Sequence, residues 1–289
     1  MQIKKTYPYL LILPALLYIG VWILYPIGKT FYLSFFSAPT THSRDYFFVG
    51  LRNYLQMATD KIFWTSLWHN ILWVGLSIAI PFMIGLLLAV TLVNRKTRLL
   101  YATIYFVPMT VAFIIAAVVW GWIYNPVFGA LNRFFEYVGL ESLKRGWLGD
   151  PNTALLAVNM IGNWGYFGFC TLIILSGLQG VDPVLYDAAN IDGAGSVQKF
   201  LHVTLPAIRH TLYFLIVYTA IGSMKFFDLI YIATKGGPHH ASEIVAVYMF
   251  DLFIRQGEIN YAASLSVMLT LIIMVLSILM IRFLYEREI

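Results

Sequence analysis

Six long apolar runs, separated by polar or mixed segments, dominate the hydrophobic pattern of the chain. A helix needs about 20 apolar residues to cross the hydrocarbon core of a bilayer, and its backbone groups are then hydrogen-bonded within the segment itself. The alternating pattern of a membrane barrel is absent. The pattern therefore predicts an all-α integral membrane protein with six transmembrane helices, at about residues 8–28, 70–93, 101–124, 153–177, 210–234 and 261–284.

The lengths of the segments between these runs predict a two-part organisation. Residues 1–69 are expected to form an N-terminal transmembrane helix and an extracytoplasmic segment. Residues 70–289 are expected to form a five-helix core that includes a cytoplasmic loop at 178–209.

Composition agrees with a membrane protein. Of the 289 residues 60% are hydrophobic and only 11% are charged, whereas a soluble domain carries about 25% charged residues. The net charge is +5, and no basic run suggests nucleic-acid binding. The single cysteine, Cys170, excludes a disulfide or a thiolate zinc site within the chain. We expect no metal site.

Basic residues indicate the orientation. Lys4 and Lys5 precede the first span, and the short segment 94–100 carries Arg95, Lys96 and Arg98. Short basic segments favour the cytoplasmic side, so we expect both chain ends in the cytoplasm. Residues 29–69, 125–152 and 235–260 then lie outside.

The loop between spans four and five has the residues of two short helices joined at a corner. Asp182-Pro183 is a helix start, Asp192-Gly193 favours a turn, Ser196 can cap a second helix, and Pro206 ends or bends it. Small side chains between these points would let a partner's backbone approach closely. The alternative is a structured connector that packs only against its own bundle.

This loop resembles the EAA loop of ABC importer permeases. The matching residues are Asp187-Ala188-Ala189, Asp192-Gly193-Ala194, Phe200 and Leu205-Pro206, with Asp187 where glutamate is usual. Two further motifs resemble the carbohydrate-uptake branch and its larger, maltose-transporter-type permease. They are Val49-Gly50-Leu51-Arg52-Asn53-Tyr54 and Thr234-Lys235-Gly236-Gly237-Pro238.

The resemblance implies a type I importer permease in a bacterial or archaeal plasma membrane. The loop would be a coupling helix that docks on a cytoplasmic ATPase. The implied partners are a second homologous permease, two ATPase subunits, an extracytoplasmic solute-binding protein and a sugar substrate. No phosphate-binding loop G-x-x-x-x-G-K-[ST] occurs in the sequence. ATP and Mg²⁺ would therefore bind to the partner ATPase, and this chain would hold no cofactor and no catalytic residue.

Polar residues inside the apolar runs are candidates for a substrate pathway, because they are costly in a membrane. Asn159 and Asn163 lie one turn apart in span four, and Thr219 and Ser223 have the same spacing in span five. The resemblance adds Met109, Phe113, Gly162 and Tyr166 as positions facing the cavity. Structural hydrogen bonds between helices are the alternative role for the polar members.

Lys225 and Asp228 are opposite charges in the middle of a span at i, i+3 spacing, which predicts an intramembrane ion pair. An unpaired Lys225 would instead attract an anionic substrate.

The chain is thus expected to be a sugar or oligosaccharide importer subunit. The alternatives are a glycerol phosphate or polyol permease of the same family, an ion-coupled secondary transporter with Asp228 as its intramembrane carboxylate, and a membrane scaffold.

Overall fold

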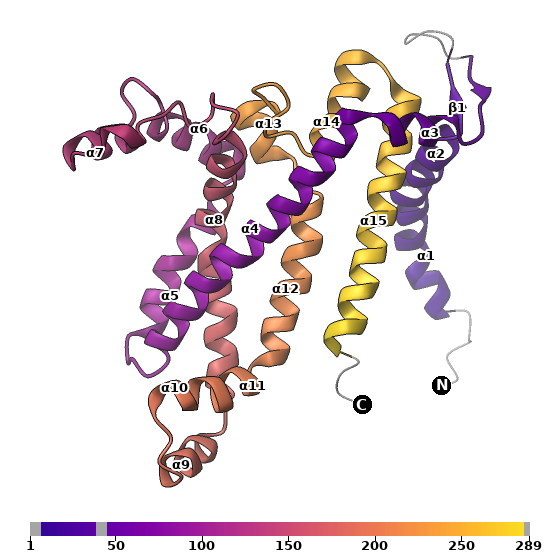
Figure 1. The fold of residues 1–289 in the computed structure, drawn as a ribbon. Helices are drawn as coiled ribbons and strands as arrows, with labels where there is room; N and C mark the ends of the chain where they lie inside the picture. The colour runs from indigo at the N-terminus through magenta and orange to yellow at the C-terminus, as the bar shows by residue number, and fades with distance from the viewer. Residues whose placement is uncertain (1–6, 39–44, 286–289) are drawn as a thin grey trace. The chain divides into compact units, whose positions relative to one another are not determined.

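The computed structural model describes residues 7–38 and 45–285. The chain forms two compact units, one built from residues 1–63 and 248–272 and the other from residues 64–247 and 273–289 (Figure 1). This division differs from the two-part organisation expected from the sequence, because residues 248–272 belong with the N-terminal segment.

Among the described residues, four continuous helices are long and apolar enough to cross a membrane: Leu11–Leu33, Lys61–Leu92, Ala154–Gln179 and Ile259–Arg282. Two further spans form only when bent helix pairs are joined, Arg98–Thr110 with Phe113–Ile123 at 92° and Ser196–Ala207 with Arg209–Met224 at 65°. The all-α membrane fold is confirmed, and the count reaches six when each bent pair is one span.

The first unit begins with an almost continuous helix and adds a short antiparallel strand pair, which the hydrophobic pattern did not predict. It contains α1 (Tyr7–Ile19), the π-helical η1 (Gly20–Leu24), α2 (Tyr25–Leu33), β1 (Phe36–Ser37), β2 (Phe47–Phe48), α3 (Arg52–Thr59), the π-helical η5 (Leu252–Gln256) and part of α15 (Ile259–Tyr285).

The motif at residues 49–54, which includes the first turn of α3, has a structural role in this unit. The Asn53 amide nitrogen donates to the carbonyl oxygens of Ser34 and Phe36, each at 2.9 Å, and the Tyr54 hydroxyl donates to Ser34 Oγ at 2.7 Å. Gly50 adopts a positive φ of 59°. The motif therefore fastens α3 to the turn between α2 and β1.

Asp60 lies between α3 and α4 (Lys61–Leu92) and accepts four hydrogen bonds. One carboxylate oxygen accepts from the backbone amides of Ile62 and Phe63, and the other accepts from the hydroxyls of Tyr248 and Tyr261 at 2.7 and 2.6 Å. Burial alone would raise the pKa of Asp60, but the hydrogen bonds outweigh it and hold the pKa below the usual 3.8.

The second unit contains most of α4 and the helices that carry the predicted loop and pathway. They are α5 (Arg98–Phe106), the 3₁₀ turn η2 (Val107–Thr110), α6 (Phe113–Ile123), α7 (Ala130–Tyr137), the 3₁₀ turn η3 (Glu141–Leu143), α8 (Ala154–Gln179), α9 (Pro183–Ile191), α10 (Ser196–Lys199), the π-helical η4 (Phe200–Thr204), α11 (Leu205–Ala207), α12 (Arg209–Met224) and α13 (Asp228–Thr234). α14 (Val245–Asp251) follows at the boundary between the units.

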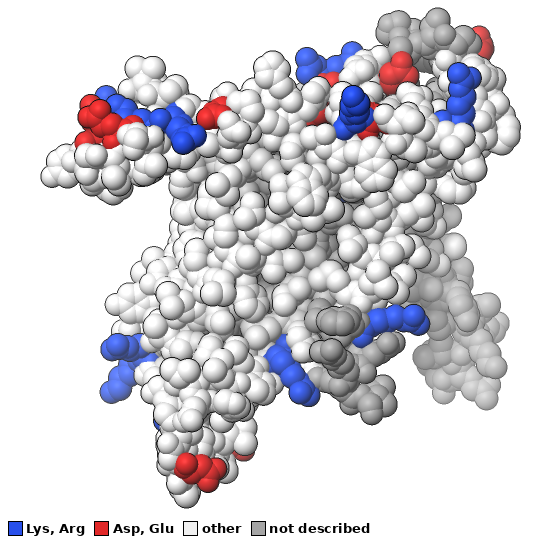
Figure 2. Space-filling view, viewed as in Figure 1, with Lys and Arg blue, Asp and Glu red and all other residues white. Residues whose placement is uncertain are grey.

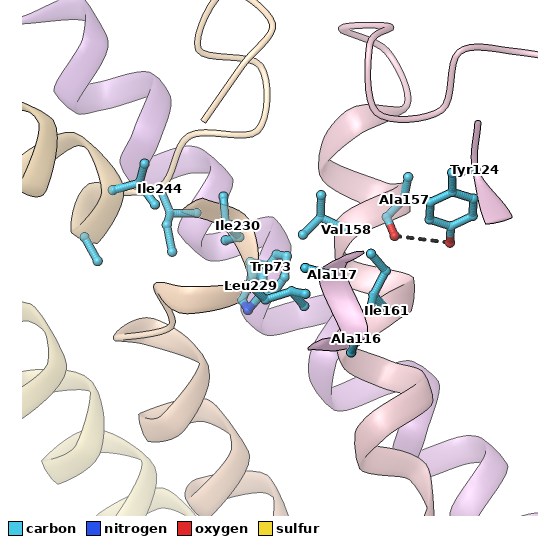
Figure 3. Close-up of a cluster of buried hydrophobic side chains, with 12 residues drawn as sticks. Trp73, Ala116, Ala117, Tyr124, Ala157, Val158, Ile161, Leu229, Ile230 and Ile244 are labelled. Carbon is cyan, nitrogen blue, oxygen red and sulfur yellow. Dashed lines mark hydrogen bonds between the residues drawn. The ribbon is translucent and has the colours of Figure 1, made fainter. Parts of the chain in front are cut away.

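Trp73 of α4 lies at the centre of the core of this unit, with 1% of its surface exposed. Ala117 of α6, Val158 of α8 and Leu229 of α13 belong to the same buried cluster (Figure 3). Small residues on α6 allow close helix packing around the indole ring.

Two predicted spans are interrupted. In the run 101–124 the helix stops at η2, where Pro108 lacks an amide hydrogen and its ring is incompatible with a continuing helix. In the run 210–234 the helix stops at Met224 and resumes at Asp228. Single continuous helices at these two places were therefore the wrong expectation.

Candidate functional site

A cavity of about 380 Å³ lies in the second unit, within the size range of roughly 300–1,000 Å³ that is usual for small-molecule sites. α4, α8, α12 and the two helix breaks supply its walls. The lining residues are Trp73, Ser77, Met109, Phe113, Gly162, Asn163, Tyr166, Tyr218, Thr219, Ile221, Gly222, Ser223, Lys225 and Phe226.

Most of the residues predicted for a substrate pathway meet in this cavity. Those that line it are Met109, Phe113, Gly162, Asn163, Tyr166, Thr219 and Ser223. Asn159 does not line the cavity. It is fully buried, and its amide nitrogen donates to Ser77 Oγ at 3.0 Å, so it connects α8 to α4 as a structural residue.

The polar side chains in the cavity are partly committed to the fold. The Asn163 amide nitrogen donates to Asn159 Oδ1 at 2.7 Å and to the Leu76 carbonyl at 3.5 Å, and the Tyr166 hydroxyl and Thr219 Oγ1 are 3.1 Å apart. The Asn163 amide oxygen has no hydrogen-bond partner among the described residues. It therefore remains as an acceptor at the cavity wall.

Sequence reasoning missed six lining residues: Trp73, Ser77, Tyr218, Ile221, Gly222 and Phe226. Of the α12 members, Gly222 follows Thr219 at i+3 spacing, so helical periodicity was a usable signal for this residue. Trp73 and Ser77 come from α4, and their place in the cavity depends on how α4 crosses α8, which one span's sequence does not reveal.

The predicted ion pair between Lys225 and Asp228 is not formed. Lys225 follows the last residue of α12, and Asp228 is the first residue of α13, so the two residues do not share a helix face. Within the described residues, no ion pair joins Lys225 to any carboxylate. Lys225 instead lines the cavity and is its one charged lining residue.

The loop between α8 and α12 forms the predicted pair of short helices. Asp182 caps α9 by accepting the Val184 amide hydrogen at 2.9 Å. At the other end Gly193 has a φ of 75°, and the amides of Gly193 and Ala194 donate back to the carbonyls of Asn190 and Ala189. This is a Schellman helix end, which favours glycine for its positive φ.

We call residues 182–207, which hold the two short helical arms and the turn between them, the coupling elbow. Two side-chain hydrogen bonds fix the corner between these arms. The Lys199 ammonium donates to Asn190 Oδ1 at 2.8 Å, and the Tyr186 hydroxyl lies 3.0 Å from Thr204 Oγ1. The second helix is capped differently from the prediction, since Gly195 precedes it and Ser196 is its first residue. The elbow therefore has a defined conformation that its own hydrogen bonds hold.

The predicted elbow residues divide between its surface and its inner side. Asp187, Ala188, Asp192, Gly193 and Pro206 are exposed, and Ala189, Ala194, Phe200 and Leu205 are half-buried. Large apolar side chains also face outward, with Ile191 87%, Val197 71% and Val184 65% exposed. Acidic side chains colour the lower tip of the molecule, where α9 lies (Figure 2).

The described residues contain no group of three or more His, Cys, Asp or Glu side chains placed to hold a metal ion. The chemical groups that the cavity offers to a ligand are aromatic rings, amide and hydroxyl groups, and the ammonium group of Lys225.

Comparison with known proteins identifies the fold. Residues 81–285 match the family described as "Binding-protein-dependent transport system inner membrane component". The chain belongs to this family. It is consequently a permease subunit of an ABC importer, and not an enzyme.

Relatives cover almost the whole permease. It is 32% identical to the probable ABC transporter permease protein YurN of Bacillus subtilis, over 97% of this chain and 96% of YurN. It is also 32% identical to the trehalose/maltose transport system permease protein MalF of Thermococcus litoralis, over 90% of this chain and 87% of MalF.

A solved structure has the same fold. A chain of a bacterial ABC transporter involved in the import of the acidic polysaccharide alginate is similar, with a TM-score of 0.84 at 18% identity over 99% of the permease and 98% of that chain. The family and this fold place the permease in a membrane as a multi-pass protein.

Proposed function

We propose that the permease forms half of the translocation pathway of an ATP-driven importer for sugars or oligosaccharides. The observation that carries this proposal is the cavity, which brings together aromatic rings and uncommitted polar groups between membrane-spanning helices. Tyr166, Tyr218 and Phe113 offer flat apolar faces to a pyranose ring, and Asn163 and Ser223 offer hydrogen-bonding groups to its hydroxyls.

The names of several relatives favour this substrate class. Besides the trehalose/maltose permease, they include an arabinooligosaccharides permease, AraP, of Bacillus subtilis and a lactose permease, LacF, of Rhizobium radiobacter. We extend sugar uptake from these relatives to the permease.

The cavity and the coupling elbow are connected through two continuous helices. α8 carries Gly162, Asn163 and Tyr166 and ends at Gln179, four residues before α9 begins. α12 carries Thr219 and Ser223 and follows α11 directly. Displacement of the elbow by a bound ATPase would therefore move two neighbouring walls of the cavity, which are joined by the contact between Tyr166 and Thr219.

The elbow has the surface of a docking site for another protein. Its tip exposes isolated large apolar side chains, which a buried interface would cover. The basic segment between α4 and α5 lies at the same end of this unit as α9 (Figure 1). Because short basic segments favour the cytoplasm, we place the elbow there, beside two ATPase subunits that bind ATP and Mg²⁺.

The opposite end of the unit would then face the outside. A structure similar to the permease, with a TM-score of 0.83, is described as an alginate transporter in complex with a substrate-bound periplasmic protein. We propose that this permease likewise works with a solute-binding protein, and with a second homologous permease that closes the cavity. Both chain ends are proposed to be cytoplasmic. Residues 1–6 and 286–289 lie outside the described part of the chain.

Narrowing the cavity tests the substrate role. A Cβ atom added at Gly222 meets no atom within 4 Å, and Gly222 lines the cavity, so Gly222→Phe is expected to place its ring in the cavity. Uptake of radiolabelled maltodextrins by cells carrying the complete transporter should fall at least tenfold. Gly75→Phe, at an equally open glycine of α4 that does not line the cavity, should preserve uptake. Equal uptake in both variants would remove the cavity from the pathway.

A second candidate substrate class is an acidic solute, which includes glycerol phosphate and anionic sugars. Lys225 favours it, because its ammonium group lines the cavity without an ion-pair partner among the described residues. One relative, 27% identical, is named as a sulfoquinovosyl glycerol permease, SmoG, of Agrobacterium fabrum.

Lys225→Gln distinguishes the two classes, since it removes the charge and keeps a hydrogen-bonding side chain. If the substrate is acidic, uptake of that acidic solute should fall strongly. If the substrate is neutral, uptake should change little.

A further inference from the structure

A second feature of the unit, apart from the cavity and the elbow, is an arm built from α7 and the turn that follows it. α7 begins seven residues after the end of α6, and α8 begins at Ala154. Since α6 belongs to a bent span and α8 is a span, the arm lies between the ends of two membrane-crossing segments. In Figure 1 it projects sideways from them, across the direction of α8.

Buried and paired polar groups hold the arm in one conformation. Trp147 Nε1 donates to Asn132 Oδ1 at 2.8 Å, and the Asn132 amide nitrogen donates to the Arg145 carbonyl at 2.9 Å. Lys144 and Glu136 form an ion pair at 3.1 Å. The arm is therefore a fixed platform, not a loose loop.

The other face of α7 is apolar and lacks cover. Tyr137 is 90% exposed and Phe134 57%, and Val138 follows them on the same face one turn from Phe134. Phe128, just before α7, is also exposed. Figure 2 shows charged side chains along the upper side of this arm and an uncharged underside. The underside faces downward in this view, the direction in which α8 extends away from the arm.

We propose that α7 lies in the boundary between lipid headgroups and acyl chains, with Phe134 and Tyr137 in the lipid and Glu136 toward water. An amphipathic helix that carries aromatic residues on its apolar face is suited to this place. A lipid layer is the occupant that the geometry favours, because the apolar underside begins where two spans leave the membrane. Residues 127–150 carry Arg133, Lys144 and Arg145 against Glu136, Glu141 and Asp150. This balanced charge means that zwitterionic lipid suffices.

This inference goes beyond the proposed function and is tested separately from it. The complete transporter, with Cys170→Ala in the permease, is reconstituted in phosphatidylcholine nanodiscs. A nitroxide label is attached to Tyr137→Cys, to Phe134→Cys or, as the matched control on the polar face of the same helix, to Glu136→Cys. Collision rates with oxygen, which enters lipid, and with a water-soluble nickel chelate are then measured by electron paramagnetic resonance.

The labels at 134 and 137 should show an oxygen-to-nickel collision ratio at least severalfold higher than the label at 136. Similar ratios at the three positions would place the whole helix in water and overturn the proposal. Protection of the label at 137 from both reagents would overturn it as well, because a protein partner would then cover the apolar face.

Discussion

At the scale of single residues, Asn70 of α4 connects the end of α12 to the start of α14. Its amide nitrogen donates to the Met224 carbonyl at 3.0 Å, and its amide oxygen accepts the Val245 amide hydrogen at 2.9 Å. The ends of helices leave backbone groups without intrahelical partners. One buried amide side chain thus satisfies the last carbonyl of α12 and the first amide of α14.

Asn70→Leu should destabilise the permease, because it leaves a buried carbonyl and a buried amide without partners. The expected loss in the free energy of unfolding is about 1–3 kcal/mol, measured by thermal unfolding in detergent. Ser66→Ala on the same helix is the control. Ser66 Oγ is buried and has no hydrogen-bond partner among the described residues, so its removal should be neutral or stabilising. Equal losses in the two variants would contradict the role of Asn70.

Asp60 gives a prediction that depends on pH. Because the folded protein holds the pKa of Asp60 below its usual 3.8, the carboxylate stabilises the fold at and above that pH, and this contribution is lost as the pH falls through the lowered value. Asp60→Asn should therefore lower the melting temperature at pH 7. The difference from wild type should shrink as the pH is lowered below about 4. A difference that stays constant from pH 7 to pH 3 would show that ionisation of Asp60 contributes nothing.

The sequence showed which side chains were unusual but not what they contact. Asn70, Asn159 and Asn163 look alike in the sequence, as single amides within apolar runs. Only the crossing of α4 and α8 makes Asn159 a buried connector and leaves Asn163 at the cavity wall. Such distinctions depend on contacts between distant segments, and local pattern does not contain them.

At the scale of elements, hydropathy located the membrane helices and missed their interruptions. The hydropathy stays high across η2 and across Phe226 and Phe227, although the helix is broken at both places, and the broken backbone there borders the cavity. Pro108 and Lys225 were the local signals of the two breaks. The elbow was better predicted, since caps and turns depend on neighbouring residues and Asp182 and Gly193 have the expected roles.

Close packing of α8 against its neighbours depends on glycine residues, which have no side chain. A Cβ atom at Gly168 would lie well inside contact distance of the Tyr105 carbonyl oxygen of α5, and one at Gly85 would lie 2.8 Å from the Cys170 Cβ. Small residues allow this kind of approach between membrane helices.

Gly168→Ala should consequently push α5 away from α8, at a cost of about 1–3 kcal/mol or more, and reduce the yield of folded permease in size-exclusion chromatography. Gly162→Ala on the same helix should be tolerated, since its Cβ would lie 3.5 Å from the nearest atom, a Leu229 methyl group. Loss of folded protein in both variants, or in neither, would contradict the packing argument.

At the scale of the whole molecule, the coupling elbow is the point where we propose that an ATPase moves the membrane helices. Replacing Gly193 by a bulky residue is a poor test, because its φ of 75° would make any such change distort the elbow itself. Ile191 is a better position. It is 87% exposed beside the turn, and a substitution there leaves the internal bonds of the elbow intact.

The most direct measurement is photo-cross-linking from the elbow in intact cells. A benzophenone amino acid placed at Ile191 should capture the ATPase subunit. The same probe at Val127, which is also 87% exposed, should not capture it, because the segment between α6 and α7 lies at the other end of the unit from α9 (Figure 1). If the elbow docks on the ATPase, the ATPase should be captured from Ile191 alone. Equal capture from both positions, or no capture from Ile191 while uptake remains ATP-dependent, would contradict this docking.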